Sequence, residues 1–167
     1  GISAAHHLQT QCPEKSFLIL EGRDSIGGTW DLFKYPGIRS DSDMYTLGFS
    51  FRPWRDPKAI ADGPSIMSYL HGAVEDDGLH DKIRFGRKVV KARWSSREAH
   101  WELTVLNRQS QQEETLTCSF VHMCTGYYNY EQGHRPAFPG EKNFKGPIIH
   151  PQFWPEDLNY DNKKVVV

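Results

Sequence analysis

The alternation of apolar and polar positions starts with a helix and a strand. Ala4, Ala5 and Leu8 form a small apolar helical face near the beginning of the chain. The run Ser16–Leu20 that follows is typical of a buried strand, and it ends in the acidic residue Glu21. The pattern therefore predicts a helix that leads directly into a strand with a carboxylate at its end.

A long segment from Gly27 to Trp54 has neither helical nor strand periodicity, and loops of this length in compact domains are usually functional. A helix is predicted next, because Pro64 can occupy its first turn and Gly78 can end it. Its apolar positions share one face, formed by Ile66, Tyr69, Leu70, Ala73 and Val74.

From residue 83 the period of apolar positions falls towards two, which predicts an antiparallel meander. Its three strands are expected at Lys88–Trp94, Trp101–Leu106 and Thr115–Cys118. The more apolar run Ser119–Cys124 is expected to return to a parallel sheet, and Lys163–Val167 to begin another strand. The connection between these two runs is rich in proline, as linkers between lobes are.

Charge and cysteine content narrow the class of protein. With 20 Lys and Arg, 21 Asp and Glu and a net charge of −1, no basic patch for nucleic acid is present, and no apolar run is long enough to span a membrane. Cys12, Cys118 and Cys124 have neither C-x-x-C nor metal-ligand spacing. We therefore expect a cytoplasmic protein with reduced thiols and no metal, nucleic-acid or membrane partner. The oligomeric state stays open.

Gly1 and Glu21 have the separation of two positions in a dinucleotide-binding fold. There, the third glycine of G-x-G-x-x-G opens the first helix, and an acidic residue about 20 positions later holds a ribose hydroxyl. Gly1 is interpreted as the last glycine of a fingerprint that begins before this chain. We accordingly expect the chain to be an internal part of a longer protein.

The run Gly27-Gly28-Thr29-Trp30 is the first candidate contact with a cofactor. Paired glycines let the backbone approach a flat ring or a phosphate where a Cβ would collide. A plain structural turn with a core tryptophan is the alternative, and Glu21, six residues upstream, favours the functional interpretation. The alternative interpretation of Asp41 and Asp43, further along the chain, is that they lie in a solvated loop or cap the N-terminus of a helix.

Residues 144–155 fit the pattern F-x-G-x-x-x-H-x-x-x-W-P, which resembles the fingerprint of type I Baeyer–Villiger monooxygenases. These flavin enzymes insert one oxygen atom of O2 beside a carbonyl or onto a heteroatom. Related N- and S-oxygenating flavin monooxygenases usually have an aromatic and a basic residue where this chain has Trp154-Pro155. A proline-rich loop in which His150 caps a turn is the alternative. The defined positions are Phe144, Gly146, His150, Trp154 and Pro155.

The resemblance extends over the whole chain. Residues 29–44 are similar to the G-G-x-W and Y-P-G-x-R-x-D segments of the family, most of all in the subgroup that contains the mycobacterial ethionamide-activating enzyme. It implies an α/β fold: a Rossmann-like FAD-binding domain of the two-dinucleotide-binding type with an inserted antiparallel meander. Residues 1–135 would form this domain, 136–163 the linker with the fingerprint, and 164–167 the first strand of an NADP-binding domain.

The resemblance also implies roles for individual residues. Glu21 would bind the adenosine ribose of FAD, Val89 would contact the adenine, and the segment 29–32 would line the flavin. Residues 39–41 would face the nicotinamide end of NADPH, and Gly126 would end a strand beside FAD, or serve only as a strand-end glycine. The candidate cofactor-binding residues are Gly1, Glu21, Gly28, Thr29, Trp30, Asp31, Leu32, Arg39, Ser40, Asp41, Val89 and Gly126.

Asp41 is the one candidate catalytic residue. In the family a carboxylate at this position holds an arginine from another lobe, and the arginine stabilises an anionic flavin peroxide. The implied activity is oxygenation of ketones or thioethers with FAD, NADPH and O2, through a C4a-peroxyflavin. Two alternatives remain: an N- or S-oxygenating flavin-containing monooxygenase, and a non-catalytic truncated fragment.

Overall fold

The computed structural model describes residues 1–167 and has an α/β architecture. The helices are α1 (Ile2–Gln11), α2 (Thr29–Leu32), α3 (Met44–Leu47) and α4 (Gly63–Asp76), with 3-10 helices η1 (His80–Lys82), η2 (Glu141–Asn143) and η3 (Pro151–Phe153). The strands are β1 (Ile19–Leu20), β2 (Ile83–Arg84), β3 (Arg87–Ser95), β4 (His100–Asn107) and β5 (Glu113–Cys118).

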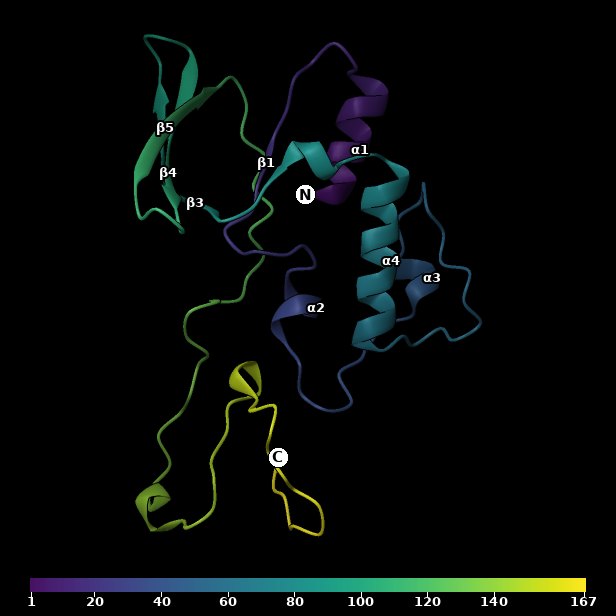
Figure 1. Ribbon diagram of the computed structural model, residues 1–167, viewed down its shortest axis with the longest axis vertical. Helices are drawn as coiled ribbons and strands as arrows, with labels where there is room; N and C mark the ends of the chain where they lie inside the picture. The colour runs from purple at the N-terminus through teal and green to yellow at the C-terminus, as the bar shows by residue number, and fades with distance from the viewer.

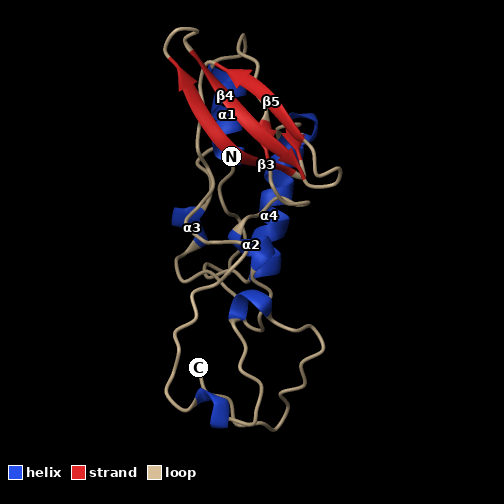
Figure 2. Ribbon diagram, turned by 90° about the vertical axis from the view of Figure 1, so that its left-hand side faces the viewer, coloured by secondary structure: helices blue, strands red, loops and turns tan.

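The molecule is elongated, with the three-stranded sheet at one end and a C-terminal arm at the other (Figures 1 and 2). Helices α1 and α4 lie on one side of β1, and the meander β3–β5 lies on the other (Figure 1). The arm runs from the end of β5 past α2 and carries only the short helices η2 and η3. The helices and strands of the first two thirds of the chain therefore provide the framework of the fold.

The main core lies where α1 and α4 pack beside the parallel pair β1–β2. Ile19 and Leu20 of β1 pair with Ile83 and Arg84 of β2. The buried apolar side chains of this core are Ala5, Ile26, Val74, Leu79 and Ile83. Because each element presents apolar residues on one side only, these elements can bury them only against one another.

Helix α4 has the predicted position and face. The Asp62 Oδ1 atom accepts a hydrogen bond from the Ser65 backbone N–H at 2.9 Å, so Asp62 caps the helix, and Pro64 lies in the first turn. Gly78 follows the helix with a positive φ of 60°, which favours glycine. Of the predicted apolar face, Ile66, Tyr69, Ala73 and Val74 are buried and Leu70 is half-buried.

The predicted antiparallel meander is confirmed. Strand β4 lies between β3 and β5, and its inward positions Leu103 and Val105 are buried. The pairing of β3 with β4 shifts register between Val89 and Lys91, which marks a β-bulge. The Arg108 guanidinium donates to the Gly22 backbone carbonyl at 3.1 Å and so attaches the meander to the end of β1.

Three predicted strands differ in the structure. The segment Ser16–Leu20 is a strand only at Ile19–Leu20, while Ser119–Cys124 and Lys163–Val167 form no strand. A strand needs a neighbouring backbone to satisfy its N–H and C=O groups. Beyond β5 no other segment of this chain pairs with residues 119–124, and Phe120 is 79% exposed. Apolar composition alone therefore overestimated these strands.

All three cysteines are free thiols. No helix of the structure combines the length and the apolar character needed to cross a bilayer.

Candidate functional site

The carboxylate of Glu21 lies at the end of β1, between β2 and β3. The Glu21 backbone N–H donates to the Arg84 carbonyl at 3.0 Å, and its own carbonyl accepts from the Arg87 N–H at 2.9 Å. On the side chain, Oε1 accepts from the Arg23 backbone N–H at 2.9 Å. Both strands thus fix the backbone of Glu21, and Oε2 remains available as an acceptor for a hydroxyl.

The glycine pair forms the turn that leads into α2. Gly27 has a φ of 107° and Gly28 a φ of 53°, which L side chains rarely adopt. A Cβ on Gly27 would also lie 2.7 Å from the Met67 Cε atom of α4. We call residues 27–28 the glycine turn. Both its conformation and its packing require glycine at position 27.

Arg23, which belongs to none of the sequence motifs, connects Glu21 to the glycine turn. Its guanidinium donates to the Gly28 carbonyl at 3.1 Å and forms an ion pair with Asp31. The guanidinium carbon also lies 5.4 Å from the ring centroid of Tyr130. The structure therefore brings Glu21, Gly28 and Asp31 together around Arg23. The signal for Arg23 in the sequence is its position two residues after Glu21, the acidic residue at the end of the predicted strand.

Trp30 and Asp31 of the predicted flavin segment line a cavity of about 410 Å³. Thr29 and Leu32 belong to the same helix but do not line it. Trp30 also packs against the second core of Met44, Ala61, Ile66 and Tyr69, so the core-tryptophan alternative holds in part. The remaining lining residues come from the loop after α2 and from α4: Phe33, Lys34, Tyr35, Gly37, Ile38, Gly63, Pro64 and Met67.

Residues 39–41 lie in the loop that precedes α3, and none is hydrogen-bonded to the group around Arg23. Ser40 is buried, and its hydroxyl donates to the Ser42 carbonyl at 2.6 Å, so this side chain shapes the loop. Arg39 is exposed and forms an isolated β-bridge with Asp62. The exposed Asp41 makes no side-chain hydrogen bond in the structure, which leaves its carboxylate free to hold another group.

Asp41 lies near a group of phenols. The pKa of Tyr128 is raised by its hydrogen bond with Tyr127, then by burial and by the neighbouring charges, of which Asp41 is one. Asp43 caps α3, because its Oδ1 accepts from the Thr46 N–H at 2.9 Å. The helix N-cap alternative is therefore correct for Asp43 and not for Asp41.

The other predicted cofactor residues are more scattered. Gly1 is the N-cap of α1, and a Cβ there would make an ordinary 3.8 Å contact with Ile19. Val89 lies on β3, two positions after Arg87, which bonds to Glu21, and is 42% exposed. Gly126 has a φ of 70°, and a Cβ on it would meet no atom within 4 Å. It is an exposed glycine that ends no strand, because residues 119–124 form none.

Two fingerprint residues, Phe144 and His150, pack against nearby glycines. A Cβ on Gly146 would lie 2.8 Å from the Phe144 ring, which therefore covers this glycine. The His150 ring lies directly against Gly133, where a Cβ would lie 2.7 Å from Nδ1. The same Nδ1 accepts from the Gln152 N–H at 3.2 Å, so His150 also caps η3, as the turn-capping alternative proposed.

Gln152 and Lys88 hold the residues around Tyr130, which we call the 129–133 segment. Gln152 is buried, and its Nε2 donates to the Asn129 carbonyl at 2.8 Å. Lys88 of β3 forms an ion pair with Glu131. Neither Gly133 nor Gln152 was singled out in the sequence, because only the fold places them beside His150 and Asn129.

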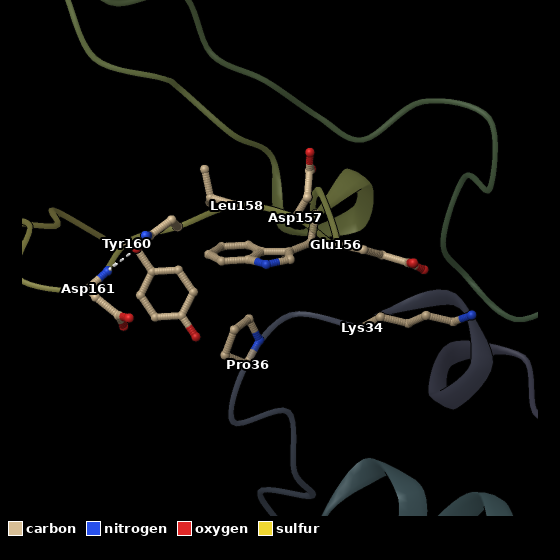
Figure 3. A pocket seen from close by; sticks show the side chains of 9 residues that line it. Lys34, Pro36, Glu156, Asp157, Leu158, Tyr160 and Asp161 are labelled. Atoms are coloured by element: carbon tan, nitrogen blue, oxygen red, sulfur yellow. Dashed lines mark hydrogen bonds between the residues drawn. The ribbon is translucent and has the colours of Figure 1, made fainter.

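Trp154 lines a second cavity, of about 680 Å³, in which the two contributing segments face one another (Figure 3). Its ring contacts Tyr160 edge-on at 5.8 Å, while Pro155 is exposed and does not line the cavity. The lining residues are Lys34, Pro36, Trp154, Glu156, Asp157, Leu158, Asn159, Tyr160 and Asp161.

Comparisons of the sequence and of the structure with known proteins both find monooxygenases. The sequence model of the flavin-binding monooxygenase-like family matches residues 49–167. The FAD-containing monooxygenase EthA is 56% identical over 167 residues in Mycolicibacterium smegmatis and 55% identical in Mycobacterium tuberculosis. The probable FAD-binding monooxygenase AlmA of Acinetobacter baylyi is 48% identical. All of this chain is covered in each case, but it spans only about a third of the relatives' length, 34% for both EthA proteins.

Solved structures with a similar fold include cyclohexanone monooxygenase bound to ε-caprolactone, with a TM-score of 0.76 at 27% identity over 95% of this chain and 30% of that one. OTEMO in complex with FAD and NADP has a TM-score of 0.74 at 28% identity, covering 94% of this chain and 29% of that one.

Proposed function

The chain belongs to the flavin-binding monooxygenase-like family, and on this premise we propose that the protein carrying it is an FAD- and NADPH-dependent monooxygenase. We further propose that it transfers one oxygen atom of O2 to a ketone, as Baeyer–Villiger enzymes do, or to a sulfur atom. In this proposal residues 1–135 form a Rossmann-like FAD-binding domain, 136–163 a linker, and 164–167 the start of an NADP-binding domain.

The single observation that carries the proposal is the arrangement of Glu21, Gly28 and Asp31 around Arg23. A carboxylate at the end of a parallel strand can hold a ribose hydroxyl of a dinucleotide, and a glycine turn beside it permits close approach of the backbone. Two hydrogen bonds from Arg23 join them at 2.9 and 3.1 Å. The residues present therefore fit FAD.

Individual roles follow from this arrangement. Glu21 would accept a hydrogen bond from a ribose hydroxyl through Oε2, and the glycine turn would let the backbone approach the cofactor. Val89, exposed on β3 two positions after Arg87, the backbone partner of Glu21, would provide an apolar contact for the adenine. Bound FAD would supply the oxygen chemistry with electrons from NADPH. The protein would bind and orient the cofactor and the substrate, and it would exclude water from the site.

Asp41 and the fingerprint would act on the other side of the site. With its carboxylate exposed and unpaired, Asp41 can position a cationic side chain, such as an arginine from outside residues 1–167. Arg39 would contribute positive charge near the nicotinamide end of NADPH. His150, packed on Gly133, would connect the linker to the 129–133 segment and so transmit movements of the linker.

The proposal is tested with the full-length protein that carries this chain. Purified protein is expected to contain FAD, to oxidise NADPH, and to convert a cyclic ketone and an aryl thioether into their oxygenated products. Product analysis by mass spectrometry with isotopically labelled O2 shows where the oxygen comes from. Absence of flavin, or products without label, would contradict the proposal.

A further inference from the structure

We propose that Tyr130 is a cofactor-positioning residue: its ring supports Arg23, and its hydroxyl covers Gly28, so that the phenol holds the glycine turn in the conformation that receives the cofactor. This inference rests on the proposed function and deepens it, because it adds to the site a residue that is distant from Arg23 and Gly28 in the sequence. Neither the glycine motif nor the fingerprint contains this residue.

The contacts of Tyr130 are made with the two groups that define the turn. The Arg23 guanidinium carbon lies 5.4 Å from the Tyr130 ring centroid, within the range where an aromatic face attracts a cation. A Cβ on Gly28 would lie 3.4 Å from the Tyr130 hydroxyl oxygen. Because a planar guanidinium can bond in its plane and stack on its face, Arg23 bonds Gly28 and Asp31 while it rests on the ring.

The hydroxyl of Tyr130 is free to act as a donor. It makes no hydrogen bond within the structure, and it lies beside the space that Gly28 leaves open. Burial raises the pKa of Tyr130, and the charge of Glu21 acts in the same direction, while Arg23 opposes both. The phenol therefore keeps its proton at neutral pH and can donate to an anionic or carbonyl oxygen of a ligand at the turn.

The position of Tyr130 is fixed by its neighbours in the 129–133 segment. The carbonyl of Asn129, immediately before it, accepts from the buried Gln152 side chain at 2.8 Å. Glu131, immediately after it, forms the ion pair with Lys88. One attachment on each side of Tyr130 thus keeps the ring beside Arg23.

The test uses the full-length protein and two substitutions. Tyr130→Leu removes ring and hydroxyl, and Tyr130→Phe removes the hydroxyl alone. We expect Tyr130→Leu to raise the Kd for FAD by about five- to thirtyfold and to change the band shape of bound flavin. Tyr130→Phe should raise the Kd by a smaller factor. Tyr45→Leu is the matched control, because Tyr45 is 57% exposed on α3 and its hydroxyl bonds only to the Asp56 carbonyl.

A double substitution separates positioning from general stability. Arg23→Lys alone should weaken FAD binding, but it should add little in the Tyr130→Leu background, because both residues act through the same contact. Additive effects, or a wild-type Kd and flavin spectrum in Tyr130→Leu, would overturn the inference. If Tyr130→Leu does not fold, Tyr130→Phe decides on the same readouts. A wild-type protein that binds no FAD would instead overturn the proposed function itself.

Discussion

At the scale of single residues, the site depends on backbone contacts as much as on side chains. Glu21 is held by hydrogen bonds to Arg84 and Arg87, and its neighbour Arg23 reaches the glycine turn through the Gly28 carbonyl. A cofactor that binds here meets groups already in place, which lowers the ordering cost of binding.

Replacement of Glu21 by alanine is expected to weaken FAD binding by about 1–3 kcal/mol, because a buried ribose hydroxyl would lose its charged acceptor. The FAD Kd of the full-length protein, measured by flavin fluorescence, checks this. Glu14→Ala is the control, since the Glu14 side chain is 65% exposed after α1. Equal Kd values for wild type and Glu21→Ala would remove Glu21 from the site.

Asp41→Asn should leave FAD bound but reduce oxygenated product by up to about 100-fold, because a positioned cation would lose the charge that holds it. NADPH consumption should continue and release hydrogen peroxide instead of product. The ratio of peroxide to product measures this effect. Asp43→Asn serves as the comparison, as asparagine also caps helices and Asp43 acts only on α3. An unchanged ratio in Asp41→Asn would show that Asp41 is an ordinary loop residue.

At the scale of elements, patterns with strong local causes were predictable. Helix α4 and the meander follow from periodicity, an N-cap at Asp62 and a stop at Gly78, all of which act within a few residues. The glycine turn and the position of Glu21 after β1 have local signals of the same kind. Tyr130 and Gly133 were not predicted, because their contacts join segments that are distant in the sequence. Arg23 was missed although its partners Gly28 and Asp31 lie close to it in the sequence. The strand predicted at residues 119–124 is wrong for the converse reason, because a strand also requires a neighbouring strand to pair with.

The N-terminus of α4 should lose stability in acid. Hydrogen bonds from the Lys58 side chain and then from Ser65 hold the pKa of Asp62 far below its ordinary value of 3.8. A lowered pKa in the folded state means that the stabilisation is complete above the ordinary value and is lost as the pH falls towards the folded pKa. Asp62→Asn keeps a capping side chain but removes the titration.

Hydrogen-exchange protection of the Ser65 and Ile66 amides, measured from about pH 2 to about pH 6 to span the ordinary carboxyl titration, follows this loss. In the wild type, protection of these amides should decrease as the pH is lowered. In Asp62→Asn it should stay nearly constant over the same range. The same pH dependence in both proteins would contradict a role for the Asp62 charge.

At the scale of the whole molecule, much apolar surface is exposed in the C-terminal part. Phe120, Met123 and Phe138 are each more than half exposed, and Val166 is 96% exposed. Large exposed apolar patches commonly mark interaction surfaces. Since the chain spans 34% of the length of EthA, activity is a property to be measured on the full-length protein.

Residues 1–167 expressed alone are expected to bind FAD only in the micromolar range or more weakly, about −8 kcal/mol or less favourable, and to oxidise no NADPH. The reason is that the parallel sheet has only two strands in this chain, so the helices around the site have a small surface to pack on. Calorimetric titration with FAD, beside the same titration of the full-length protein, gives both affinities. Nanomolar binding by residues 1–167 would contradict this expectation.

The pairing of β1 with β2 also sets an order of assembly. Ser95 pairs with His100 across a short turn, so this contact is local in the sequence. The pair Ile19–Ile83 is distant in the sequence, and His6 and Asp77, which are hydrogen-bonded, are 71 positions apart. Local hairpins close quickly and distant contacts slowly. During synthesis, α1 and β1 leave the ribosome before β2 and α4 have been made, so their apolar side chains stay exposed to solvent until then. Glu21 consequently reaches its final geometry late, so slower β1–β2 pairing would lower the yield of flavin-loaded protein without changing its affinity.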